Sequence, residues 1–75
     1  MIAIELEKLS ADDLTGYDSM MMETTIRVKD ISKLAIQLWS AVLKELSNRN
    51  LVSLISGSFD DVGNALIQRH YQTSV

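Results

Sequence analysis

The stretch ISKLAIQLWSAVLKEL, residues 31–46, determines most of what the sequence predicts about the fold. Its apolar side chains recur at spacings of three and four residues, which is typical of one face of an α-helix. The stripe consists of Ile31, Leu34, Ala35, Leu38, Val42 and Leu46. Because Ile36, Trp39 and Leu43 are apolar as well, the apolar arc spans about 220° of the helix surface. A single neighbouring helix does not cover so wide a face.

A second helix is predicted after this one. The stretch SNRN, residues 47–50, interrupts the apolar pattern, and Asn50 is a suitable N-cap. Apolar residues then recur at helical spacing again, although Gly57 and Gly63 lie among them. The predicted core consists of Ile31, Leu34, Leu38, Val42, Leu51, Ile55, Phe59, Val62 and Leu66. The predicted fold class is therefore mainly α, a small helical hairpin or bundle.

The composition limits what can stabilise the chain. Its 75 residues form one domain at most, close to the size at which a single core is only just sufficient. The absence of cysteine excludes disulfides and thiolate metal sites, and one histidine argues against a histidine-built zinc site. Nearly half of the residues are apolar, which argues against disorder. A folded protein that assembles into an oligomer, without cofactor or metal, is thus expected.

The charge is divided unevenly along the chain. Residues 1–23 carry six acidic residues and one lysine, whereas residues 24–75 carry a net charge of +2. This predicts an acidic N-terminal arm (1–23) before a helical interaction domain (24–75). Within the arm, residues 2–7 fit a strand or a helix equally well. Ser10 is a predicted N-cap for a short helical turn, followed by a loop to about Ser19.

The stretch TTIRVKD, residues 24–30, alternates like a β-strand. A strand at 24–29 would place Thr25, Arg27 and Lys29 on one side, where they could contact DNA. The order strand, helix, helix from Thr24 to His70 resembles the ribbon-helix-helix class of repressors and antitoxins. That resemblance implies a dimeric DNA-binding regulator with these three residues on the DNA. The alternative is an unbroken helix from about Ser19 to Leu46.

No group of residues predicts catalysis. Asp60 and Asp61 are adjacent, so on a helix their side chains diverge by about 100° and do not share a proton or a metal ion. His70 has no nearby cysteine or acidic residue as a partner, which favours a surface position. The serines around Gly57 match neither a nucleophile elbow nor a phosphate-binding loop. We therefore expect a protein that is not an enzyme.

The wide apolar face predicts the function. We expect a non-enzymatic module that assembles with itself or with a larger protein partner through this face. The predicted partner-binding residues are Ile36, Trp39, Leu43 and Leu46, and Trp39 is equally compatible with burial in the monomer. No stretch approaches the roughly 20 apolar residues of a membrane span. A cytoplasmic protein without a membrane partner is expected.

Overall fold

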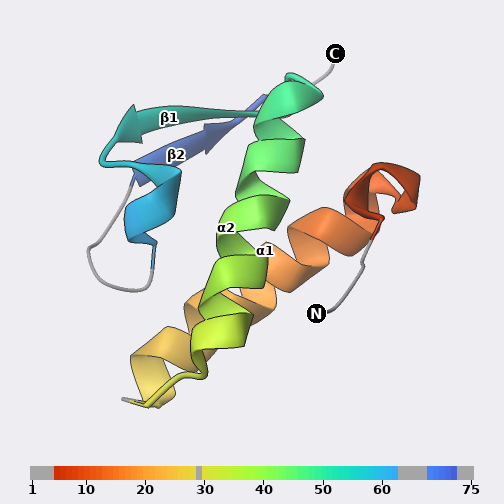
Figure 1. Ribbon diagram of the computed structural model, residues 1–75. Coiled ribbons are helices and arrows are strands. Elements are labelled where there is room, and N and C mark those ends of the chain that lie inside the picture. The colour runs from red at the N-terminus through yellow and green to blue at the C-terminus, as the bar shows by residue number, and fades with distance from the viewer. Residues whose placement is uncertain (1–4, 29, 63–67, 73–75) are drawn as a thin grey trace.

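The described part of the chain contains two α-helices and a small antiparallel sheet (Figure 1). The computed structural model describes residues 5–28, 30–62 and 68–72. The elements in chain order are the 3-10 turn η1 (Leu6–Lys8), α1 (Ala11–Arg27), α2 (Lys33–Asn48), β1 (Val52–Ser56), the 3-10 turn η2 (Phe59–Asp61) and β2 (Gln68–Tyr71). The predicted mainly α class is confirmed, and the sheet is an addition. Of the ambiguous segment 2–7, residues 2–4 lie outside the described ranges.

α1 begins at the N-cap that the sequence predicts. Ser10 Oγ accepts a hydrogen bond from the Asp13 backbone N–H at 3.1 Å, and Asp12 and Asp13 place negative charge at the positive end of the helix dipole. The helix then continues through Gly16, where a loop was predicted. A glycine inside a helix costs about 1 kcal/mol. Complete burial of Leu14 in the same helix outweighs this cost.

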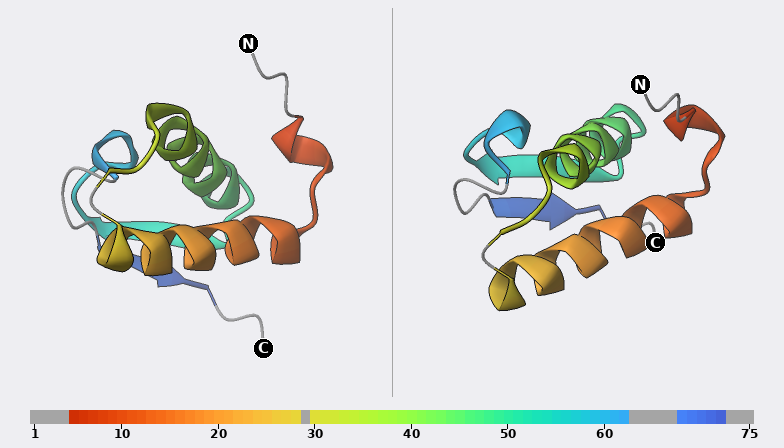
Figure 2. Two further views of the ribbon diagram at one scale, coloured as in Figure 1. Left: turned by 90° about the horizontal axis from the view of Figure 1, so that it is seen from below. Right: turned by 60° about the horizontal axis from the view of Figure 1, so that its bottom comes forward.

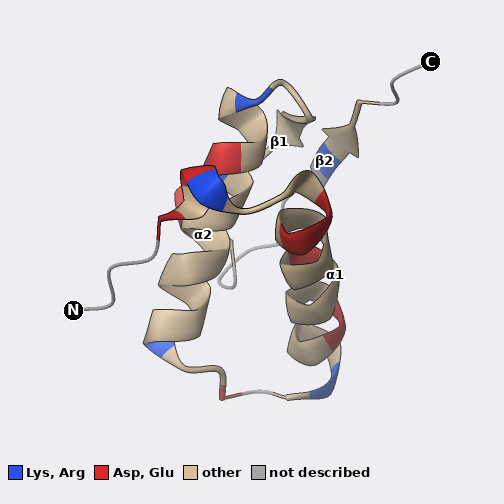
Figure 3. Cartoon of the chain, turned by 90° about the vertical axis from the view of Figure 1, so that its right-hand side faces the viewer, with Lys and Arg blue, Asp and Glu red and all other residues tan. Residues whose placement is uncertain are grey.

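Residues 11–23 are part of this packed helix and not a solvated acidic arm. Leu14, Asp18 and Met21 lie four and three residues apart, so they share one helix face, and all three are buried. Acidic positions are distributed along α1, as Figure 3 shows, and most of them are exposed on its other faces. The predicted boundary between 1–23 and 24–75 therefore falls inside α1. The acidic charge of this segment therefore does not distinguish a solvated arm from a helix that is buried along one face.

The predicted strand at 24–29 is wrong for residues 24–27, which form the last turn of α1. The hydroxyls of Thr24 and Thr25 each donate a 2.8 Å hydrogen bond to a backbone carbonyl one turn earlier in the helix. These bonds let two β-branched residues remain helical. The helix ends at Val28, whose backbone is extended with φ −120° and ψ 127°.

α2 begins independently of α1. Ser32 is its N-cap, and the Ser32 Oγ accepts hydrogen bonds from two backbone N–H groups of the first turn at 3.2 and 3.5 Å. The direction of the chain reverses between the end of α1 and the start of α2, as the lower left of Figure 1 shows. The unbroken helix considered from about Ser19 to Leu46 is therefore also wrong.

The buried face of α2 is displaced from the predicted stripe toward Trp39 and Leu43. These two residues, together with Val42 and Leu46, are at most 2% exposed. Leu34, in contrast, is 63% exposed, so its assignment to the core is wrong. The physical reason is that position 34 lies about 140° around the helix from position 39.

The wide apolar arc of α2 is covered by the chain itself. α1, η1, β1 and η2 all pack against α2, and the left view of Figure 2 shows α1 and the sheet below α2 and η2 to its left. Trp39, Leu43 and Leu46 are consequently buried within one chain, and Ile36 is half-buried against the same core. The prediction that these four residues form an exposed partner-binding face is corrected accordingly.

A strand replaces the second predicted helix. Asn50 adopts φ 60°, a left-handed conformation that asparagine tolerates better than most residues, and the chain leaves the axis of α2 there. In the strand that follows, Val52 is buried, Ser53 is exposed and Leu54 is half-buried. This alternation has the period of two that defines a strand with one covered face. In the sequence, the closely spaced apolar residues of this segment fit both the strand period of two and the helix period of 3.6.

β1 and β2 form an antiparallel pair with one irregularity. The register pairs Val52 with Tyr71, Ser53 with His70, Leu54 with Arg69 and Ser56 with Gln68. The step after Leu54 is a β-bulge that leaves Ile55 without an opposite residue. The Ile55 side chain is 65% exposed, so its assignment to the core is wrong.

The hydrophobic core joins both helices to the sheet. Its buried members are Leu14, Met21, Trp39, Val42, Leu43, Leu46, Val52 and Val62. Among the other predicted core residues, Ile31, Leu38, Leu51 and Phe59 are half-buried against this cluster, and Leu66 lies outside the described residues. Two of the nine predicted core positions, 42 and 62, are thus fully buried.

Candidate functional site

A buried carboxylate, Asp18, connects three elements of the fold. Asp18 lies on α1 and is 1% exposed. Its Oδ1 accepts a 2.7 Å hydrogen bond from Trp39 Nε1 on α2, and its Oδ2 accepts a 2.9 Å bond from Arg69 Nε on β2. The Tyr71 hydroxyl, two residues further along β2 and therefore on the same strand face, also donates to Oδ2. The burial of a charge is tolerated here because it is paired and fully hydrogen-bonded.

The surroundings of Asp18 suit a structural role. Burial raises the pKa of Tyr71 to about 12, and the hydrogen bond and negative charge of Asp18 act in the same direction, while Arg69 opposes them. Tyr71 therefore stays a neutral hydrogen-bond donor across the physiological pH range. Since the Asp18 carboxylate is enclosed, a substrate does not reach it. The cluster of Asp18, Trp39, Arg69 and Tyr71, called the Asp18 centre below, holds β2 against the helices.

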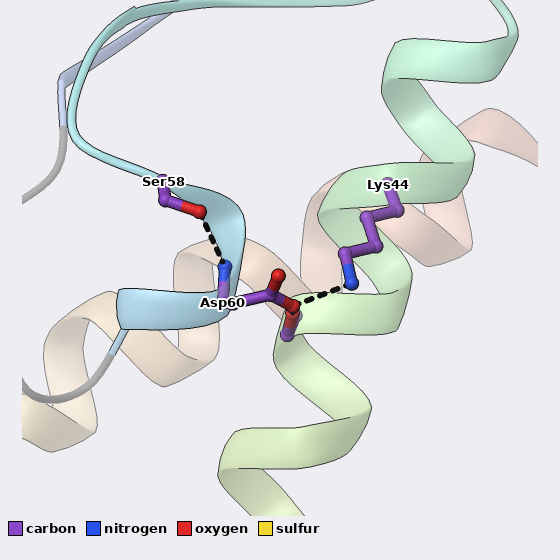
Figure 4. A network of polar contacts seen from close by, with 4 residues as sticks. Lys44, Ser58 and Asp60 are labelled. Atoms are coloured by element: carbon purple, nitrogen blue, oxygen red, sulfur yellow. Dashed lines mark hydrogen bonds and ion pairs between the residues drawn. The ribbon is translucent and has the colours of Figure 1, made fainter.

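Asp60 belongs to a second, exposed polar cluster, which Figure 4 shows. Its Oδ1 lies 2.5 Å from Lys44 Nζ on α2 and 3.5 Å from the Ser40 hydroxyl. The hydrogen bond and charge of Lys44 hold the pKa of Asp60 below its ordinary value. Ser58 caps η2 by accepting a hydrogen bond from the Asp60 N–H at 3.3 Å. This cluster fixes η2 to α2 and leaves Asp60 paired with lysine and not with its neighbour Asp61.

The structure brings together no set of potential metal ligands within 5–28, 30–62 and 68–72. No group of three or more histidine, aspartate or glutamate side chains in these ranges could hold a metal ion. His70 is exposed on the outer face of the sheet, opposite Ser53. Among the described residues, side chains capable of acid-base chemistry meet across elements in the Asp18 centre and in the pair of Asp60 and Lys44.

The residues predicted to contact DNA do not form a ribbon. Thr25 and Arg27 lie in the last turn of α1, and Lys29 is outside the described residues. The Arg27 guanidinium is paired with Glu23 one turn earlier at 3.0 Å. Because the ribbon-helix-helix resemblance depends on a strand at this position, its key element is missing for residues 24–27. For residues 24–27, the strand on which the DNA-binding alternative was based is therefore a helix.

The turn between α1 and α2 carries three exposed apolar side chains. Ile26 in the last turn of α1 is 83% exposed, Val28 at its C-cap is 46% exposed, and Leu34 in the first turn of α2 is 63% exposed. We call this group the hairpin end. Sequence reasoning missed it because Leu34 fits the helical stripe and Ile26 fits a strand. The signal that could have found it is the angle, around each helix axis, between the exposed position and the buried face of that helix: Ile26 in α1 and Leu34 in α2.

Neither helix in the described ranges combines the length and the apolar character needed to cross a membrane. No protein-family model matches the chain, and no curated protein or solved structure matches it either. The function is therefore inferred from the geometry of the chain itself.

Proposed function

We propose that the protein is a small, non-enzymatic interaction module that binds a protein partner through the hairpin end. The observation that carries the proposal is the exposure of Ile26, Val28 and Leu34 at the single turn that joins α1 to α2. Apolar side chains gathered in one region of a surface are typical of interaction sites, and these three belong to residues 26–34, on the two helix ends that the turn joins. The hairpin end replaces the wide face of α2 as the surface for a partner.

The charges around the hairpin end favour a protein over a nucleic acid. Glu23 and Arg27 form an exposed ion pair, and Asp30 in the turn and Lys33 at the start of α2 are exposed. These four described residues carry two charges of each sign. Binding to a phosphate backbone requires a concentration of positive charge, which these four described residues do not supply. An apolar centre with a mixed polar rim is the usual anatomy of a protein interface.

The contacts made by the Asp18 and Asp60 carboxylates support a non-enzymatic role. The Asp18 carboxylate is enclosed by three donors, and the Asp60 carboxylate is paired with Lys44. A catalytic carboxylate must be accessible to the substrate, and one of its oxygen lone pairs must be free to face the substrate. The described carboxylates that make cross-element contacts are engaged in holding elements together.

Site-specific photo-crosslinking tests the proposal. A photoreactive phenylalanine derivative replaces Ile26 in the full chain, in the cells that produce it, and the captured protein is purified and titrated against the chain. The double variant Ile26→Glu/Leu34→Glu should weaken binding of this protein at least about tenfold, because truncated or charged hot-spot positions cost about 1.4 kcal/mol or more. The matched control is Leu9→Glu, which charges an exposed apolar position before the other end of α1. Equal binding by all variants would overturn the proposal.

A further inference from the structure

The outer edge of β1 presents backbone groups that pair with nothing in the sheet. The Gln72 N–H donates to the Leu51 carbonyl at 2.9 Å, while the Leu51 N–H donates to the Leu46 carbonyl, so a single bond marks this opposite pair as a hydrogen-bonding position of the ladder. Hydrogen-bonded and non-hydrogen-bonded pairs alternate along an antiparallel ladder. Ser53 therefore also bonds toward β2, whereas the N–H and C=O groups of Val52 and Leu54 point away from it.

This edge carries one of the usual protections against strand pairing, a bulge at Ile55, but its residues 50–58 include no charged side chain and no proline. The sheet of the described residues has two strands, and β1 lies along the upper margin of the molecule in Figure 1. Natural proteins protect such edges with lysine, proline or inward-pointing charges. Residues 50–58, NLVSLISGS, contain neither a charged side chain nor proline. A bulge at Ile55 limits the regular part of the edge to the residues before it.

We infer that β1 pairs with β1 of a second copy of the chain, giving one four-stranded antiparallel sheet. A two-fold axis through Ser53 places Val52 of each copy opposite Leu54 of the other. Since both residues direct their backbone groups outward, each of these two opposite pairs forms two N–H···O bonds. The regular part of the edge is then fully satisfied.

Charge favours an identical strand as the occupant. Two neutral strands approach without like-charge repulsion, and an uncharged edge offers nothing that would select a charged partner instead. The free edge of β2 is less suitable for self-pairing, because the equivalent two-fold axis would pass through His70 and bring two copies of its imidazole together. The inference goes beyond the proposed function, since β1 and the turn between the helices lie at different ends of the molecule in Figure 1.

Single-cysteine cross-linking tests the symmetric register. The two-fold axis sets the two Ser53 Cα atoms about 4.5 Å apart, as in any non-hydrogen-bonded pair, which lies within the range of about 4.4–6.8 Å that a disulfide spans. The natural chain has no cysteine, so Ser53→Cys introduces its only thiol. Ser53→Cys should form a covalent dimer under mild oxidation much faster than the control Ser19→Cys, an equally exposed serine on α1.

A charge exchange at the same position tests the interface without covalent chemistry. Ser53→Lys and Ser53→Glu each place like charges directly opposite one another across the axis, so each variant alone should be monomeric in sedimentation experiments. Mixing the two variants should restore the dimer, whereas Ser19→Lys should sediment as the natural chain does. Because Ser53 is exposed, each variant should keep its helices, and circular dichroism checks this.

The outcomes separate this inference from the proposed function. A monomeric natural chain up to millimolar concentration, with Ser53→Cys reacting no faster than Ser19→Cys, would overturn it and leave the edge to an extended segment of another protein. A dimer that survives Ser53→Lys but is lost in Ile26→Glu would also overturn it, and would place self-association at the hairpin end. If Ser53→Lys by itself is monomeric and its mixture with Ser53→Glu forms a dimer, the result supports pairing of β1 with β1. This holds whether or not the hairpin end binds a partner.

Discussion

Replacing Asp18 with alanine should lower the free energy of unfolding by about 3–5 kcal/mol, the loss expected when one partner of a buried ion pair is removed. The magnitude follows from burial, because Asp18 is 1% exposed and the Arg69 side chain is 8% exposed, so water does not replace the lost carboxylate. Trp39 Nε1–H and the Tyr71 hydroxyl lose their acceptor in the same step. A chain of 75 residues has a total stability of about 4–11 kcal/mol. The variant should therefore lose between about a quarter and all of this stability.

Urea unfolding, followed by circular dichroism and by the fluorescence of Trp39, measures this loss. The matched control is Glu23→Ala, which breaks an ion pair with Arg27 whose side chains are 67% and 74% exposed. Solvent screens that pair, so its removal should change the stability by about 0.5 kcal/mol or less. A loss for Asp18→Ala as small as that of the control would refute the reasoning, since it would mean that water reaches the carboxylate.

A second variant separates charge from packing. Asp18→Leu combined with Arg69→Met removes both charges and fills the space with apolar side chains. Such replacements of buried ion pairs are often neutral or stabilising, so the double variant should recover most of the stability lost in Asp18→Ala. A double variant as unstable as Asp18→Ala would show that hydrogen-bond geometry at the Asp18 centre matters more than the unpaired charge.

Three further predictions concern stability and are measured by equilibrium unfolding. The pKa of Tyr71 is about 12 in the folded chain against 10.0 ordinarily, so its contribution is fully present below pH 10 and is lost as the pH rises toward 12; Tyr71→Phe should remove this part of the alkaline loss, and an unchanged profile would contradict it. Leu43→Ala should lower the free energy of unfolding by about 2–5 kcal/mol because Leu43 is buried. Leu34→Ala should lower it by about 0.5 kcal/mol or less because Leu34 is exposed. Equal losses would show that the buried face of α2 lies elsewhere on the helix. Gly16→Ala should add about 0.5–1 kcal/mol because nothing lies within 4 Å of the added Cβ, whereas Gly57→Ala, at φ 87°, should remove about 1–2 kcal/mol; effects of the same sign would be inconsistent with these conformations.

The predicted site residues illustrate the limit of reading a surface from sequence. Apolar periodicity located a broad face on α2 but did not reveal whether another part of the same chain would cover it. Trp39 became a donor to Asp18, 21 residues earlier, and Leu43 became fully buried. The exposed apolar residues lie at Ile26 and Leu34 instead. Exposure depends on what packs opposite a residue, and that information is not local.

The sequence by itself determined the local features of this protein. The helical spacing between residues 31 and 46 and the N-cap at Ser10 act within a few residues of the chain, and both are present in the structure. Tertiary structure alone decided the conformation of segments whose local preferences were balanced. Residues 24–27 became helical and 52–56 became a strand. Their apolar residues fit both periods, and small differences in propensity were outweighed by burial against α2 and by the pairing of β1 with a strand that begins at Gln68.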